Sequence, residues 1–148
     1  MSLLRIEHTV RIDRSPADVF IYLTDVEKLP EWQASALEVS VEGEMSLGTC
    51  IREIRNFLGR RAESTLEVTE YEPARKFSLR VLSGPLPFEV RHALTPEGEG
   101  TRVDWVAEAD TSRFPKLAVR MMAGTAERQF KGDLERLKRV LEGNTQPA

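Results

Sequence analysis

One long amphipathic stretch, residues 114–141, constrains the fold more than any other feature of the chain. Its apolar residues recur mostly at steps of three and four, which predicts an α-helix with a single apolar stripe. The stripe consists of Phe114, Leu117, Ala118, Met121, Met122, Thr125, Phe130, Leu134, Leu137 and Leu141. Such a helix is about 40 Å long. It cannot cover its own stripe, so a broad apolar partner must lie against it.

Residues that favour helix ends flank this stretch. Asp110, Thr111 and Ser112 can cap its start, Pro115 suits its first turn, and Gly143 and Asn144 suit its end. A shorter helix is predicted after residue 15, where Ser15 can act as the cap and Pro16 fits the first helical position. A second short helix is expected to follow it and to end at residues 29–32.

Almost everything else before the long helix alternates between apolar and polar residues, which predicts β-strands. The expected strands are residues 4–13, 37–42, 50–57, 62–71, 77–81, 88–94 and 101–110. Turn residues separate most of them, and Gly59-Arg60 is expected to form a hairpin turn. Short connections between successive strands predict an antiparallel meander. The fold class is therefore α+β, with a seven-stranded antiparallel sheet curved around the long C-terminal helix.

Composition limits the functional classes. The chain has 148 residues, a net charge of −3 and one cysteine, Cys50. We expect one domain over residues 1–143 with a loose tail over 144–148, no nucleic-acid partner and no disulfide. No apolar run reaches the roughly 20 residues of a membrane span, so we expect no integral membrane segment. A single cysteine favours a reducing compartment, and the cytoplasm is the simplest choice.

Three short motifs carry a family resemblance. They are Ile-Asp-Arg-Ser-Pro-Ala-Asp-Val-Phe at 12–20, Leu-Pro-Glu-Trp at 29–32 and Tyr-Glu-Pro-Ala-Arg-Lys-Phe at 71–77. With the order of elements, they resemble the START-like superfamily, and within it the polyketide cyclase/dehydrase and lipid-transport branch, related in fold to birch-pollen allergens. The resemblance implies a helix-grip fold with an internal cavity for a hydrophobic or aromatic small molecule. Members cyclise polyketides or carry lipids or hormones, and no shared catalytic set can be transferred.

Acid–base chemistry has three candidate residues, Glu53, Arg55 and His92. Glu53 and Arg55 share strand parity with the apolar Ile51 and Phe57, and His92 lies on an apolar parity of its own strand. If these parities face the interior, the three groups could polarise a ligand carbonyl or move a proton. The alternative is that a different register turns Glu53 and Arg55 to solvent.

Other reactive groups give weaker patterns. His8 and His92 lack the spacing of metal ligands, so we expect no metal and no cofactor. Cys50 and His92 could pair as nucleophile and base, but no sequence signature of a catalytic cysteine surrounds Cys50. His8 lies on the apolar parity of the first strand and is expected at the edge of the core.

Candidate ligand-binding residues come from large or adaptable side chains near the expected cavity. They are Trp32, Phe57, Trp105, Met121, Met122 and Thr125. Ordinary core packing is the alternative for most of them. The long helix is also basic outside its stripe, which can indicate a membrane-surface helix. Because the fold needs the apolar stripe, a solvated basic face is the expectation.

Three functions follow from these observations. The first is binding of a hydrophobic small molecule, lipid or polyketide-like, between sheet and helix. The second is a cyclase or dehydratase that uses Glu53, Arg55 and His92. The third is a stress-related or chaperone-associated interaction domain, which would have a small cavity and an apolar outer patch. An exposed edge strand could also support a homodimer.

Overall fold

The computed structural model describes residues 3–143 and contains seven strands, two α-helices and one 3₁₀ helix. The elements are β1 (Leu3–Ile12), α1 (Pro16–Thr24), the 3₁₀ helix η1 (Val26–Glu31), β2 (Ala36–Val41), β3 (Cys50–Phe57), β4 (Arg60–Glu72), β5 (Lys76–Ser83), β6 (Phe88–Glu97), β7 (Gly100–Asp110) and α2 (Lys116–Leu141). The tail expected over 144–148 lies outside the described residues.

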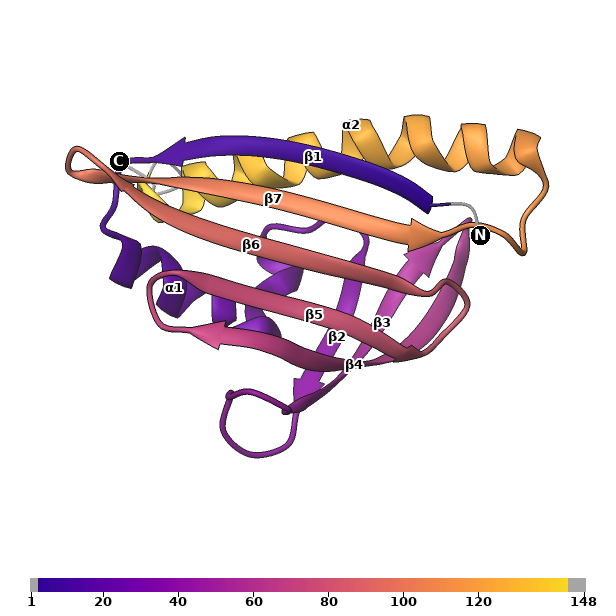
Figure 1. Ribbon diagram of the computed structural model, residues 1–148, viewed down its shortest axis with the longest axis horizontal. Coiled ribbons are helices and arrows are strands. Elements are labelled where there is room, and N and C mark those ends of the chain that lie inside the picture. The colour runs from indigo at the N-terminus through magenta and orange to yellow at the C-terminus, as the bar shows by residue number, and fades with distance from the viewer. Residues whose placement is uncertain (1–2, 144–148) are drawn as a thin grey trace.

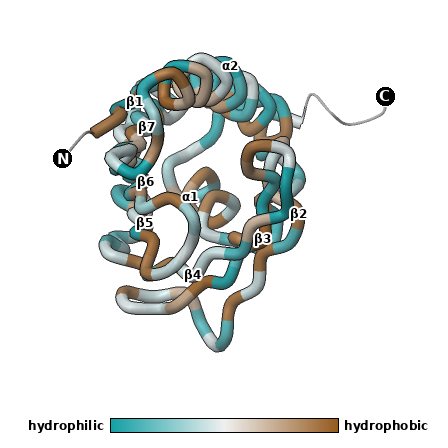
Figure 2. The backbone as a smooth tube through the Cα atoms, turned by 90° about the vertical axis from the view of Figure 1, so that its right-hand side faces the viewer, coloured by the Kyte–Doolittle hydropathy of each residue, from teal (hydrophilic) through white to brown (hydrophobic). Residues whose placement is uncertain are grey.

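All seven strands form one antiparallel sheet in the order β1-β7-β6-β5-β4-β3-β2. Register shifts occur where β4 pairs with β5 and where β2 pairs with β3, and such bulges bend the strands that carry them. The sheet therefore curves, and α2 lies across its open side (Figures 1 and 2). The predicted α+β helix-grip architecture is confirmed.

One end of the space between sheet and helix is filled by side chains. Ser15 caps α1 by accepting a hydrogen bond of 3.2 Å from the backbone N–H of Asp18, as predicted. The α1 helix then buries Val19, Phe20 and Leu23, while the last turns of α2 bury Leu134, Leu137 and Leu141. This packing places the hydrophobic core toward the C-terminal end of α2.

The start of α2 differs from the prediction. The helix begins at Lys116, Pro115 occupies its N-cap position, and no side chain caps it. The Asp110 carboxylate instead accepts a 3.0 Å hydrogen bond from the backbone N–H of Ser112. Asp110 therefore stabilises the turn between β7 and α2 and does not cap the helix, because the chain turns at this point before the helix starts. Gly143, which was expected to suit the end of the helix, follows it with a φ of 77°, in the left-handed conformation.

The apolar stripe of α2 is only partly buried, so the broad partner expected for it covers only part of its length. Met122, Leu134, Leu137 and Leu141 are buried, whereas Leu117, Met121 and Thr125 are exposed. The reason is geometric: the first turns of α2 extend past the end of the sheet (Figure 1). Nothing in the described chain covers the stripe there.

The hairpin between β3 and β4 turns one residue earlier than predicted. Phe57 pairs with Arg60, which leaves Leu58 and Gly59 as the two loop residues in place of Gly59 and Arg60. Both have positive φ, 52° at Leu58 and 81° at Gly59. Positive φ at both positions suits the right-handed twist of a hairpin, but a leucine adopts it only with strain.

Candidate functional site: a cavity between the sheet and the long helix

A cavity of about 510 Å³ lies between the concave face of the sheet and α2. Residues of α1, η1, every strand except β2, α2 and some connecting segments line it, and most are apolar. Its volume falls within the range of about 300–1,000 Å³ that is typical of small-molecule sites.

Small residues explain why this space stays open. Ala62, Ser64, Ala107, Ala109 and Ala126 contribute to the lining from β4, β7 and α2. Their side chains are too short to meet across the gap between a curved sheet and a straight helix. At the other end of the molecule, larger side chains on α1 and α2 close the same gap.

All the candidate site residues line this cavity: Glu53, Arg55, His92, Trp32, Phe57, Trp105, Met121, Met122 and Thr125. On β3, Glu53 and Arg55 lie on the face that points to the cavity. The alternative register, with both residues in solvent, is therefore wrong. Met121 and Thr125 lie at the exposed margin of the lining. The roles of these residues in binding or catalysis stay predictions.

Arg55 is the centre of a polar network on one wall. Its Nε and Nη2 donate hydrogen bonds to the two carboxylate oxygens of Glu53, at 3.0 and 3.1 Å. Its Nη1 donates to Ser35 Oγ at 2.6 Å, and its Nη2 also donates to Gln33 Oε1 at 2.8 Å. Glu53 is only 3% exposed, so its charge depends on Arg55 for compensation. The network ties the segment 33–35 to β3.

The same segment is held from the other side by α2. Asp133 Oδ1 accepts a 3.0 Å hydrogen bond from the backbone N–H of Ala34, and Arg136 Nη1 donates to the carbonyl oxygen of Trp32 at 3.1 Å. Burial raises the pKa of Asp133, and only part of this effect is opposed by the Ala34 N–H and Arg136. Charged groups on two elements therefore fix the segment that carries Trp32.

Four side chains of these networks were not predicted from the sequence: Gln33, Ser35, Asp133 and Arg136. Asp133 did give an indication, because it follows Phe130 by three residues and therefore shares the apolar face of the helix. A carboxylate on such a face needs a partner. Gln33 and Ser35 lie in a segment without a periodic pattern, so nothing in the sequence distinguished them.

An aromatic row crosses the concave face of the sheet. His8 of β1 and His92 of β6 both pair with Trp105 of β7, and His92 pairs with Phe77 of β5. The rings of His8 and Trp105 stack with centroids 6.1 Å apart, and those of Phe77 and His92 with centroids 5.8 Å apart. Trp105 also packs on Phe130 of α2 at 4.6 Å. Phe77, His92, Trp105 and Phe130 of this row line the cavity and form an aromatic section of its wall.

His92, one of the residues that line the cavity, carries a buried acceptor without a partner. Its Nδ1 lies 2.9 Å from the carbonyl oxygen of Phe77. A carbonyl only accepts, so Nδ1 carries the proton and Nε2 keeps a free lone pair. Burial lowers the pKa of His92 to about 4, against the opposing effect of the Phe77 hydrogen bond. The ring is therefore neutral at pH 7, and its buried Nε2 has no partner among the described residues.

Trp32 presents the complementary group. Its indole Nε1–H is buried and has no hydrogen-bond partner in the described part of the chain. Indole nitrogen only donates, so the lining holds one free donor and one free acceptor among mostly apolar side chains. Buried polar groups are usually paired, and these two unpaired groups belong to residues that line the cavity.

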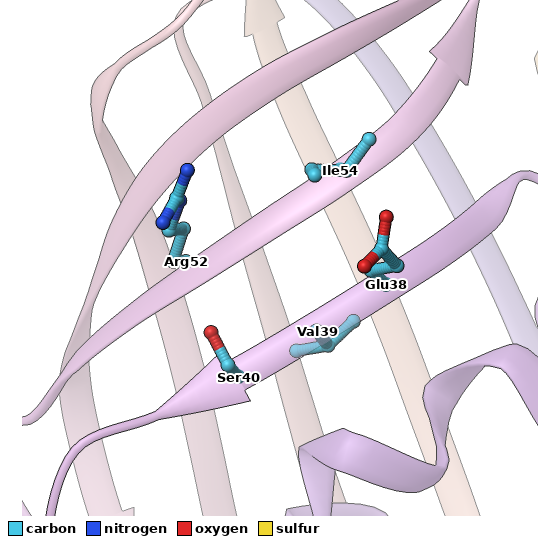
Figure 3. Close-up of a pocket in the computed structure, with 5 residues that line it drawn as sticks. All are labelled: Glu38, Val39, Ser40, Arg52 and Ile54. Atoms are coloured by element: carbon cyan, nitrogen blue, oxygen red, sulfur yellow. The ribbon is translucent and has the colours of Figure 1, made fainter.

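A second, shallower pocket of about 220 Å³ lies on β2 and β3 (Figure 3). Glu38, Val39, Ser40, Arg52 and Ile54 line it. Arg52 donates to both carboxylate oxygens of Glu63 at 3.0 and 2.9 Å, and Glu38 accepts from Arg61 at 2.7 Å. Both of its charged side chains already have partners, so this pocket offers no unpaired charge to a ligand.

Cys50 lies outside the cavity. It is exposed at the start of β3 and is not among the lining residues, whereas His92 is buried. The structure does not bring the two together, so the nucleophile–base pair considered from the sequence is not formed.

The curved sheet, the long helix and the cavity between them define a helix-grip protein. The chain belongs to the polyketide cyclase/dehydrase and lipid transport family, whose model matches residues 4–142. Helix-grip proteins of this family bind hydrophobic ligands. No curated protein sequence matches the chain.

Solved structures agree with the fold at low sequence identity. The chain is similar to the Zhui aromatase/cyclase from Streptomyces sp. R1128, with a TM-score of 0.82, 19% identity and coverage of 98% of this chain and 97% of that one. It is also similar to a START superfamily protein from Mycobacterium smegmatis, with a TM-score of 0.71, 17% identity and coverage of 96% and 97%. Ara h 8.0201 gives a TM-score of 0.70 at 13% identity, with coverage of 95% and 98%.

Among residues 3–143, no helix combines the length and the apolar character needed to cross a bilayer.

Proposed function

We propose that the protein binds one hydrophobic small molecule, of lipid or polyketide-like class, in the cavity beneath α2. The observation that carries this proposal is the apolar cavity of about 510 Å³ with a free donor at Trp32 and a free acceptor at His92. Leaving such groups unpaired costs about 1–3 kcal/mol each. A ligand that carries a hydroxyl or carbonyl group on an apolar body recovers this cost.

The charged network supports binding rather than chemistry as the main role. Arg55 already donates to Glu53, Ser35 and Gln33, so its guanidinium is largely occupied in holding the cavity wall. A ligand would meet an electrically balanced pair on this wall. Orientation would then come from the neutral groups of Trp32 and His92, and affinity from apolar contact.

Native mass spectrometry of the purified protein, followed by denaturing extraction, tests whether a ligand is carried. A paired titration then tests its orientation: 2-naphthol and naphthalene are added to wild-type protein and to His92→Phe, with tryptophan fluorescence as the readout. We expect His92→Phe to weaken 2-naphthol binding about tenfold, the value of one unpaired polar group, and to leave naphthalene binding unchanged. Failure of both probes to bind would contradict the proposal.

A second candidate function is a polyketide cyclase or dehydratase, favoured by the convergence of Glu53, Arg55 and His92 on one cavity. A neutral imidazole with a free Nε2 can accept a proton, although a pKa of about 4 makes it a weak base. Product analysis with a poly-β-ketone substrate would distinguish this function, since a carrier returns the compound unchanged.

The third function, an interaction domain with a small cavity, fits less well. The cavity has the volume of a ligand site.

For the compartment, we propose the reducing cytoplasm, supported by a single, exposed free cysteine, Cys50. Subcellular fractionation of the native host checks this proposal.

A further inference from the structure

Exposed apolar side chains gather at one end of the molecule. Leu3, Leu58, Leu117 and Met121 come from β1, the β3–β4 turn and the first turns of α2, and are between 60% and 70% exposed. We call these four residues the apolar rim. Leu3 pairs with Asp110 at the end of β7, and the rings of Phe57 and Phe114 meet at 6.3 Å. These contacts bring the segments together at the end where α2 begins, which faces the viewer in Figure 2.

The rim surrounds the opening of the cavity. Leu58 and Met121 belong to the cavity lining although both are largely exposed, so the cavity reaches solvent beside them. Leu58 is also held at a φ of 52°. Asparagine or glycine suits this turn position better, and strained residues tend to mark functional sites. The exposure of a strained leucine beside the opening therefore points to a surface with a partner.

Free cations border the rim. Arg60, Arg113, Lys116 and Arg120 are exposed and form no ion pair within residues 3–143, whereas most basic side chains elsewhere in the structure are paired. The nearby carboxylate of Asp110 has its pKa lowered by hydrogen bonds from Ser112 and by the charge of Arg113, so it stays ionised and offsets one of the four positive charges. This end is therefore locally basic on a chain whose net charge is −3.

We propose that the apolar rim and its four cations dock on an anionic lipid bilayer, with the cavity opening against the lipid. Apolar side chains beside Lys and Arg fit a surface whose headgroups are negative and whose interior is apolar. A second copy of this chain fits less well, because an isologous interface would place the four cations opposite their own equivalents. The surface also explains why the start of the α2 stripe has no cover within the fold. Docking does not depend on the proposed ligand, since the rim is present whether or not the cavity is filled.

Vesicle flotation of the full chain tests the proposal. Vesicles of phosphatidylcholine alone and of phosphatidylcholine with 30 mol% phosphatidylglycerol are the probes, about 30 mol% being strongly anionic. We expect binding to the anionic vesicles that decreases with salt. Leu117→Glu should abolish it, and Leu47→Glu is the matched control, because Leu47 is 67% exposed in the β2–β3 loop away from the rim.

The cations are tested separately. Lys116→Ala should reduce the partition coefficient about fivefold, the worth of one basic residue near an anionic surface. The control is Lys131→Ala, an exposed lysine farther along α2. Equal loss in both variants would overturn the assignment of the patch.

Two further outcomes would also overturn the proposal. The first is no binding to any vesicle by protein with a wild-type melting curve. The second is a dimer in analytical ultracentrifugation that Leu117→Glu dissociates, which would make the rim an interface between copies. If wild-type protein floats with anionic vesicles but binds neither 2-naphthol nor naphthalene, the proposed function alone would be contradicted.

Discussion

Replacing His92 with phenylalanine should remove a pH dependence of stability. In the folded protein, burial lowers the pKa of His92 to about 4, whereas its ordinary value is 6.5. Because the folded pKa is the lower one, the unfolded chain takes up the proton first as the pH falls. The stability that His92 contributes is therefore complete above pH 6.5 and is lost progressively as the pH falls toward 4.

The magnitude follows from the two pKa values. The interval from 6.5 to about 4 corresponds to about 3 kcal/mol at about 1.36 kcal/mol per pH unit. This is a large share of the roughly 5–15 kcal/mol that stabilises a typical domain. His92→Phe lacks the hydrogen bond to the Phe77 carbonyl and should be somewhat less stable at pH 7. Its stability should nevertheless fall less steeply with acid.

Urea unfolding at intervals between pH 7 and pH 4 measures both proteins, and the difference between their slopes isolates His92 from the carboxylates. The reasoning would be refuted by parallel slopes. An independent check is the imidazole ¹⁵N spectrum, in which Nδ1 should be protonated and Nε2 unprotonated at pH 7. A spectrum with the proton on Nε2 would contradict the free acceptor on which the proposed ligand orientation depends.

Other predictions concern packing and charge. Arg55→Met should cost about 3–5 kcal/mol in urea unfolding because it leaves the Glu53 charge buried without a partner, and a Glu53→Gln/Arg55→Met double variant should recover part of the loss. Asp133→Asn keeps the oxygen that accepts a hydrogen bond from Ala34. Because the pKa of the Asp133 carboxyl is raised in the folded protein, wild type should lose stability relative to the variant as the pH rises from 3.8. A difference in unfolding free energy that stays constant with pH would contradict this. Gly100→Ala should destabilise by about 1–3 kcal/mol, because its Cβ would lie 2.6 Å from a backbone oxygen. Gly132→Ala, where the new Cβ meets nothing within 4 Å, should raise the melting temperature through about 0.5–1 kcal/mol of helix propensity.

The periodic pattern of apolar residues was sufficient to predict the architecture of the fold. Alternation along each strand and the spacing of the α2 stripe identified the elements, and short turns fixed their antiparallel order. The inward face of β3 was also predictable in part, because Glu53 and Arg55 share it with apolar Ile51 and Phe57. Local patterns of this kind depend on which side of an element is buried, and that information is present in the sequence.

Contacts between distant segments were not predictable in the same way. Arg55 bonds to Gln33 and Ser35 across about 20 residues, and Asp133 bonds to Ala34 across 99. Such pairs depend on how the segment after η1 meets β3 and α2, which no periodic pattern encodes. The exposure of Leu117 and Met121 was missed for a related reason: a stripe predicts a partner surface, but it does not tell where that surface ends.

Two sides of the cavity differ in how firmly they are held, and this difference suggests which part of a ligand each side would recognise. The Trp32 segment is held by Arg55 from β3 and by Asp133 and Arg136 from α2, so its indole N–H has a fixed position. On the open side, Met121 and Met122 are unbranched and can repack around different shapes. A polar group on the ligand would therefore be selected at the fixed wall, whereas the apolar remainder could vary toward the rim. Hence Trp32→Phe should change which ligands bind by removing one donor, while Met122→Leu should change affinity within a series of apolar chain lengths.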